Sequence, residues 1–212
     1  PVRLRYESPD GTLYTLNLID TPGHVDFSYE VSRSLAACEG ALLLVDAAQG
    51  VQAQTVANVH LAQEYGLTVI PVLNKIDLPS ADIEGSTEQM MELLQCDPDE
   101  IMHVSAKTGK GVGELLEKIV ARIDPPAPPD DDALRMLVFD SHYDNYKGVI
   151  VYGRMKSGRL TAGRRIRFMS TGRDFDVSEL GVFAPRMTPI DELTPGNVGY
   201  FTATIRDAAD VK

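Results

Sequence analysis

Hydrophobic positions in the first 124 residues alternate between the spacing of strands and the spacing of helices. Four apolar runs have the length expected of buried strands, and they cover residues 13–19, 41–45, 68–73 and 101–104. After each run except the third, apolar residues recur every three or four positions, as on one face of a helix. These faces are Phe27, Val31, Leu35 and Cys38, then Val56, Val59 and Ala62, and last Val112, Leu115, Leu116, Ile119 and Ile123. Strands that alternate with helices are typical of an α/β fold with a mostly parallel sheet.

The pattern changes after a proline-rich segment. Asp124 is followed by Pro125-Pro126-Ala127-Pro128-Pro129 and three aspartates, and proline cannot continue a helix. Beyond it, apolar runs separated by glycine turns predict strands at residues 134–139, 148–155, 165–169 and 198–203. Because no helical pattern follows, we expect a small antiparallel β-barrel. We therefore predict an α/β domain over residues 1–124, a linker over 125–132 and a barrel domain over 133–212.

Composition places the chain among ordinary globular proteins, with 43% hydrophobic and 24% charged residues. Residues 40–45 form the longest apolar run, which is far shorter than the roughly 20 residues of a membrane span. Two cysteines, Cys38 and Cys96, do not suggest a disulfide or metal framework, and we expect a reducing cytoplasm. The formal charge of −11 argues against a chain that wraps nucleic acid. Residues 153–173, with seven Arg and Lys and no acid, are interpreted as a solvated hairpin face, with contact to RNA phosphates as the alternative.

An acidic residue and a glycine follow the first predicted strand, in the sequence Asp20-Thr21-Pro22-Gly23-His24. Asp20 could hold a water of a phosphate-bound Mg²⁺, because this ion usually keeps several waters. Gly23 lacks a Cβ, so its N–H can approach a γ-phosphate. His24 is placed to orient the attacking water of phosphoryl transfer, and we predict that it is catalytic.

A second polar motif, Asn74-Lys75-Ile76-Asp77, ends the strand at residues 68–73. The Asp77 carboxylate can accept hydrogen bonds from N1–H and the exocyclic amine of guanine, a donor pair that adenine lacks. Asn74 can bridge to neighbouring loops and the Lys75 stem can lie over the base, whereas Ile76 is expected to pack inward. The alternative is an ordinary polar turn after a buried strand.

A third motif, Ser105-Ala106-Lys107, also follows a predicted strand. The N–H of Ala106 can donate to guanine O6, and Lys107 can pack over the base. About thirty residues separate this motif from Asn74, which leaves room for one helix. All three motifs therefore lie where open α/β sheets bind ligands, at the carboxyl ends of strands.

Longer segments resemble the translational GTPases, and most closely the LepA family, also called elongation factor four. The segments that carry the resemblance are residues 16–19, 24–40, 45–51, 70–73 and 78–82 in the α/β part, and 139–141, 169–172 and 179–183 in the barrel. Together with the three motifs, these segments extend the resemblance over nearly the whole chain. Their sequences distinguish this family from elongation factor G.

The resemblance implies a P-loop-type GTPase domain followed by a translation-factor barrel. It also implies that the GTPase uses Mg²⁺ with GTP or GDP. Its implied partners are the ribosome, through rRNA and ribosomal proteins, and the tRNA-bearing elongation complex, on which the family is described as back-translocating tRNAs. It implies a cytoplasmic protein that also associates with the cytoplasmic face of the bacterial membrane. We expect a monomer.

The chain departs from the family in one large respect, because no G-x-x-x-x-G-K-[ST] loop occurs in its 212 residues. The resemblance implies that this phosphate loop, a central strand, the first helix and the first switch precede Pro1, and that further domains follow Lys212. We hypothesise that the chain is a fragment with a truncated GTPase domain. Two other hypotheses are a non-catalytic ribosome-binding module and another translational GTPase, such as a ribosome-protection factor.

Overall fold

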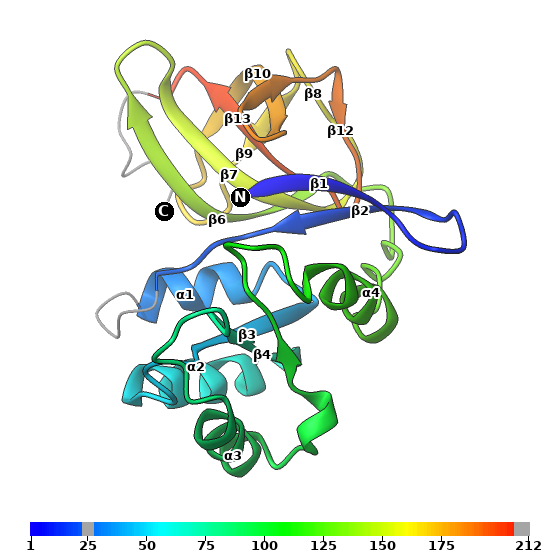
Figure 1. Cartoon of the computed structure of the whole chain (residues 1–212). Helices are drawn as coiled ribbons and strands as arrows, with labels where there is room; N and C mark the ends of the chain where they lie inside the picture. The colour runs from blue at the N-terminus through cyan, green and yellow to red at the C-terminus, as the bar shows by residue number, and fades with distance from the viewer. Residues whose placement is uncertain (23–27, 206–212) are drawn as a thin grey trace. The chain divides into compact units, whose positions relative to one another are not determined.

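The computed structural model describes residues 1–22 and 28–205, which divide into two compact units. One unit is Pro22–Pro125, and the other joins Pro1–Thr21 to Pro126–Lys212. The division at Pro125 falls within the predicted linker region, whereas residues 1–21 are grouped with the barrel and not with the α/β part. The predicted domain bounds stay a prediction, and each unit is described by itself below (Figure 1).

The Pro22–Pro125 unit is built on a parallel sheet in the order β3-β4-β5. Its register pairs Asp46 with Asn74, so the carboxyl ends of β3 and β4 lie at one edge. Helices connect these strands, as parallel pairing requires. The elements are α1 (Ser28–Leu35), β3 (Gly40–Asp46), α2 (Ala53–Glu64), β4 (Thr68–Asn74), α3 (Ile83–Leu94), the short 3₁₀ helix η2 (Pro98–Glu100), β5 (Met102–His103) and α4 (Val112–Arg122).

Alternating side chains of β4 divide the core of this unit between the two faces of the sheet. Ile70 and Val72 are buried against Leu115 of α4. Leu73 points the other way and is buried with Met90 of α3. Since successive strand residues face opposite sides, a strand buried on both sides is apolar throughout, which explains the unbroken apolar run. The two loops that follow β4 and β5 are thereby anchored on a packed core.

Antiparallel strands form the other unit. The main sheet follows the path β11-β10-β13-β7-β6, with β9 also paired to β10, and β8 pairs with β12 separately. Its inner side chains form one cluster that includes Val151, Leu180 and Phe201. The strands are β6 (Arg135–Asp144), β7 (Gly148–Ser157), β8 (Leu160–Thr161), β9 (Arg165–Arg167), β10 (Asp174–Phe183), β11 (Met187–Pro189), β12 (Glu192–Leu193) and β13 (Val198–Ala203). An antiparallel half-barrel following an α/β part with a parallel sheet confirms the predicted fold class.

Residues 13–19, predicted as a strand of the mostly parallel sheet, form part of a separate hairpin. β1 (Val2–Glu7) and β2 (Leu13–Leu18) pair antiparallel along their whole length. The local reason is the tight turn between them, which Ser8 N–H closes by donating to the Thr12 carbonyl at 2.9 Å. Within the described residues, β1 is the ladder partner of β2.

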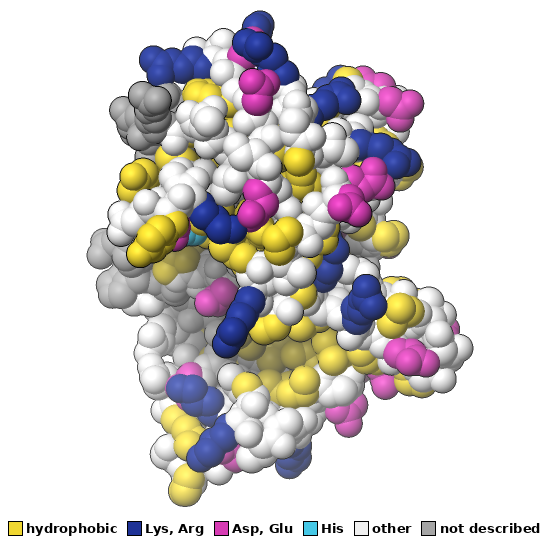
Figure 2. Space-filling model, turned by 90° about the horizontal axis from the view of Figure 1, so that it is seen from above, with side chains coloured by type: hydrophobic (Ala, Val, Ile, Leu, Met, Phe, Trp, Pro, Cys, Tyr) yellow, Lys and Arg dark blue, Asp and Glu magenta, His cyan; other side chains and the backbone are white. Residues whose placement is uncertain are grey.

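Arginines of the basic stretch, residues 153–173, are paired with acids in the sheet. Arg167 donates twice to Asp174, at 2.6 and 2.9 Å, and Arg159 pairs with Glu192 at 3.1 Å. These exposed pairs lie on the surface of the strands (Figure 2 shows the mixture of blue and magenta side chains on one face). No helix in the described part of the chain is both long and apolar enough to cross a membrane.

Candidate nucleotide-binding site

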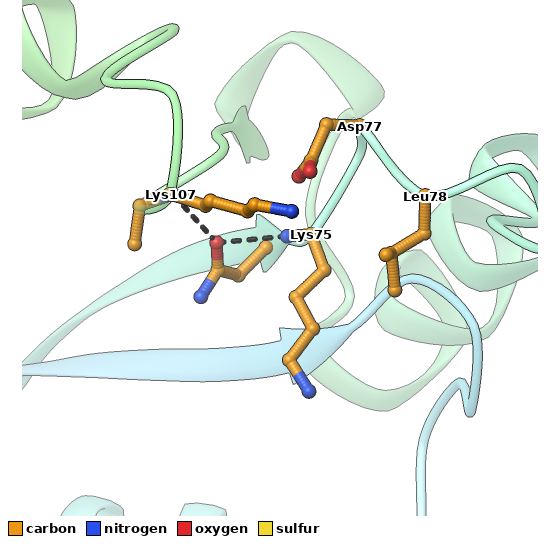
Figure 3. A pocket seen from close by; sticks show the side chains of 6 residues that line it. Lys75, Asp77, Leu78 and Lys107 are labelled. Carbon is orange, nitrogen blue, oxygen red and sulfur yellow. Dashed lines mark hydrogen bonds between the residues drawn. The ribbon is translucent and has the colours of Figure 1, made fainter.

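A hollow of about 280 Å³ lies where the loops after β4 and β5 meet. The residues that line it are Asn74, Lys75, Asp77, Leu78, Ala106 and Lys107 (Figure 3). Five of these belong to the second and third sequence motifs. The two loops come together because β4 and β5 run parallel, so both strands end at the same edge of the sheet.

Asn74 joins the two loops through a single side-chain oxygen. Its Oδ1 accepts the backbone N–H of Lys75 at 2.8 Å and that of Ala106 at 3.0 Å. The N–H of Ala106, predicted to donate to guanine O6, is therefore donated to Asn74 in this structure.

Asp77 is held by the third motif. Its Oδ1 accepts a hydrogen bond of 2.6 Å from the Ser105 hydroxyl, and the same hydroxyl accepts the N–H of Thr108 at 3.2 Å. Ser105 is fully buried, so its hydroxyl has a fixed position. The hydrogen bond from Ser105, assisted by the charge of Lys107, lowers the pKa of Asp77 from its ordinary value. The Asp77 carboxylate that lines the hollow is therefore ionised.

The two lysines flank the hollow on different sides. Figure 3 shows the Lys107 stem extending across it toward Asp77, and the Lys75 stem running away from Asp77. The Lys75 ammonium lies 2.7 Å from a carboxylate oxygen of Asp46, at the end of β3. Asp46 was not among the predicted site residues. The signal that could have found it is an acid at the end of the strand paired with β4, directly opposite Asn74.

Ile76 contributes no side chain to the lining of the hollow. It packs beneath the loop against the cluster that contains Val45 and Leu73. Its backbone N–H donates to the Val104 carbonyl at 3.4 Å, which ties the loop to the end of β5. An apolar residue is needed at this position because the loop crosses the edge of the core.

None of the three residues predicted to act on the phosphates and the attacking water is among the described residues that line this hollow. Asp20 follows β2 in the other unit and is described only with that unit. Gly23 and His24 lie outside the described residues. Across the described residues, no group of three or more His, Cys, Asp or Glu side chains is arranged to hold a metal ion. The roles of Asp20, Gly23 and His24 therefore stay predictions.

The arrangement suits a flat heterocycle that carries two adjacent donors. A fixed, ionised carboxylate can accept both donors, and the aliphatic stems of two lysines can cover apolar ring faces while their ammonium groups stay in water. Leu78 adds an apolar surface to the same hollow.

Comparison with known proteins identifies the class. Residues 3–125 match the model of the elongation factor Tu GTP-binding domain, which is more than half of the chain. The chain therefore belongs to this family of GTP-binding domains.

The particular relatives agree with the resemblance found in the sequence. Elongation factor 4 of Protochlamydia amoebophila (strain UWE25) is 54% identical over 100% of this chain. Elongation factor 4 of Aquifex aeolicus (strain VF5) is 53% identical over 100% of it. The predicted resemblance to this family is confirmed. The chain spans 35% of the length of either relative.

A solved structure supports the fold. The bacterial selenocysteine-specific elongation factor EF-Sec superposes with a TM-score of 0.73 at 23% sequence identity. The match covers 99% of this chain and 36% of EF-Sec. At that identity the likeness concerns the fold alone.

Proposed function

We propose that this chain is part of a translational GTPase of the elongation factor 4 family and that the hollow between β4 and β5 binds the guanine base of GTP and GDP. The observation that carries the proposal is the Asp77 carboxylate, fixed by buried Ser105 at 2.6 Å beside the loop that Asn74 ties in place. The family match over residues 3–125 supports the same class of ligand.

The proposed recognition follows from the donors of the base. Guanine N1–H and the exocyclic amine donate to Asp77, whereas adenine would leave the carboxylate without these partners. The Lys75 and Lys107 stems cover the two faces of the ring. In this proposal the N–H of Ala106 donates to guanine O6 once the base displaces Asn74 from it.

The proposed hydrolysis uses residues outside the hollow. In this proposal Asp20 would hold a water of the Mg²⁺, and the ion would neutralise phosphate charge. In this proposal Gly23 donates its N–H to the γ-phosphate, and His24 orients the attacking water. These assignments rest on the order of residues after β2.

The wider role is proposed from the relatives and the resemblance. The intact protein would bind the ribosome and a tRNA-bearing elongation complex as a monomer, and back-translocation of tRNAs is the family's described activity. We also propose that it works in the cytoplasm, with association to the membrane surface.

The decisive experiment exchanges the base. Asp77→Asn in the intact protein should lower ribosome-stimulated hydrolysis of GTP and raise hydrolysis of XTP. Xanthine carries a carbonyl where guanine carries the amine, so the new amide can donate to it. Phosphate release is measured with GTP, XTP and ATP, with and without ribosomes. Unchanged preference for GTP in this variant would refute the assignment of the base pocket.

A further inference from the structure

Asp46 takes no part in the proposed base recognition, yet it makes several contacts beside the hollow. Its Oδ1 accepts the N–H of Ala48 at 2.8 Å. Its Oδ2 accepts the side-chain amide of Gln49 at 3.1 Å and the ammonium of Lys75 at 2.7 Å. The carboxylate is therefore fixed by its own loop and presented to Lys75.

Asp46 reaches Lys75 because of strand pairing and not because of sequence proximity. The parallel register places Asp46 opposite Asn74, the residue before Lys75. The Asp46 side chain is 18% exposed and the Lys75 side chain 52% exposed. A rigid acid at the end of a packed strand therefore meets a flexible base from the neighbouring loop.

Lys75 is held in an unusual position at both of its ends. Its backbone φ is +66°, in the left-handed region that residues other than glycine rarely adopt. Its N–H donates to Asn74 Oδ1 at 2.8 Å, and its Nζ contacts Asp46. Between these two anchors, the aliphatic stem lines the hollow (Figure 3).

We propose that Asp46 is a positioning residue for the base pocket: its ion pair with Lys75 holds the lysine stem as one wall of the space for the purine. This inference rests on the proposed function and extends it to a residue outside the three sequence motifs. A free lysine stem samples many rotamers, and ordering it on binding opposes association. Asp46 removes that freedom before the base arrives.

A role in stabilising the fold explains the ion pair between Asp46 and Lys75 less well than a role in positioning the lysine stem does. Exposed ion pairs contribute little to folding stability, and this lysine is half exposed. The hydrogen bond from Lys75 lowers the pKa of Asp46, so the carboxylate is ionised at neutral pH. The contribution of the pair is therefore expected in binding more than in unfolding.

The test is a double-mutant cycle in the intact protein, with GDP and IDP affinities as readouts. Asp46→Asn keeps an acceptor for Ala48 and loses the charge, and Lys75→Met keeps an aliphatic stem and loses the ammonium. Each should weaken GDP binding about tenfold, and the double variant should be no weaker than either single variant. IDP lacks the exocyclic amine that would donate a hydrogen bond to Asp77, so the ratio of GDP to IDP affinity reports on Asp77. Because these variants leave Asp77 unchanged, that ratio should stay the same as in the wild type.

A matched control removes another ion pair of the same unit. Glu100→Gln breaks the contact with Arg122 at 3.2 Å, a pair in which neither residue lines the hollow, and should leave GDP affinity unchanged. Thermal unfolding of every variant checks that the fold is retained.

The outcomes separate the two proposals. Wild-type GDP affinity for Asp46→Asn, or effects of the two single variants that add in the double variant, would overturn the positioning role alone. A wild-type protein without preference for GDP over ADP would overturn the base pocket and the positioning role together. A changed GDP to IDP ratio in Asp46→Asn would show that Asp46 acts on Asp77, which also contradicts the proposal.

Discussion

Single residues at the hollow differ in how tightly they are held. Ser105 is fully buried and directs its hydroxyl to Asp77, whereas the Lys107 stem extends across the opening. A fixed acceptor with an aliphatic stem beside it suits a planar ligand, because the acceptor selects the ligand and the stem covers one of its faces. Selectivity is therefore expected to depend on Asp77 and affinity on the lysines.

His24 carries a residue-scale prediction of its own. His24→Ala in the intact protein should leave GTP affinity unchanged and slow ribosome-stimulated turnover by on the order of a hundredfold. The reason is that orienting the attacking water matters only in the transition state. Turnover is measured as phosphate release at saturating GTP, and affinity by nucleotide titration.

His60→Ala is the control for that prediction, since His60 lies exposed on α2. It should behave as the wild type. Normal turnover of His24→Ala would remove this histidine from the mechanism.

Among the elements, α4 determines the shape of the loop that carries Ser105. The loop closes on itself, because Ser105 N–H donates to the Lys110 carbonyl at 2.9 Å and Gly109 N–H donates to the Ser105 carbonyl at 2.8 Å. Gly111, the N-cap residue directly before α4, has a φ of +74°. A Cβ at Gly111 would lie 2.3 Å from the backbone oxygen of His103 in β5. The start of the helix is thus pressed against the strand that precedes the loop.

Replacement of Gly111 by alanine should consequently destabilise the chain. The left-handed backbone of an alanine costs about 1 kcal/mol, and the overlap with the His103 oxygen adds about 1 to 3 kcal/mol. Gly109→Ala is a matched control, because Gly109 also has a positive φ of +81° and no atom within 4 Å of its Cβ position. Urea unfolding followed by circular dichroism compares the two variants. Equal losses of stability would mean that the close approach to β5 does not constrain the helix.

At the scale of the whole molecule, the chain consists of two compact units. Residues 124 to 133 are all exposed, and this segment is rich in proline. Proline-rich segments are stiff and extended, and exposed backbone is accessible to proteases. The segment is therefore a spacer by both its sequence and its exposure.

Brief digestion with an endoproteinase that cleaves before aspartate should cut first within Asp130-Asp131-Asp132. Asp176 lies within β10, where it is paired with Arg165 of β9, and should be protected. Mass spectrometry of the first products reports the site. Early cleavage before Asp176 instead would contradict the described strand.

Several parts of the fold could be predicted from the sequence because their pattern is local. The apolar run at residues 68–73 matches β4, and residues 198–203 match β13. β10 could not be predicted in this way. Acids such as Asp174 and Glu179 interrupt its apolar residues, and a bulge between Val177 and Glu179 shifts the alternation of its two faces.

The same distinction holds for the candidate site. Asn74, Asp77 and Ser105 were found because their motifs follow the apolar runs at residues 68–73 and 101–104, and order along the chain is enough to see this. Asp46 was missed, and the N–H of Ala106 has a partner other than the predicted one, since both contacts join distant segments.

The amino-acid order by itself determined the family, the elements with clean periodicity and the identity of most groups that line the hollow. Tertiary structure alone decided which of those groups meet. The pairing of Lys75 with Asp46 depends on the register of β3 and β4 and on one left-handed backbone angle. Periodicity is a property of neighbouring residues, whereas register and backbone angles are settled only when the whole core packs.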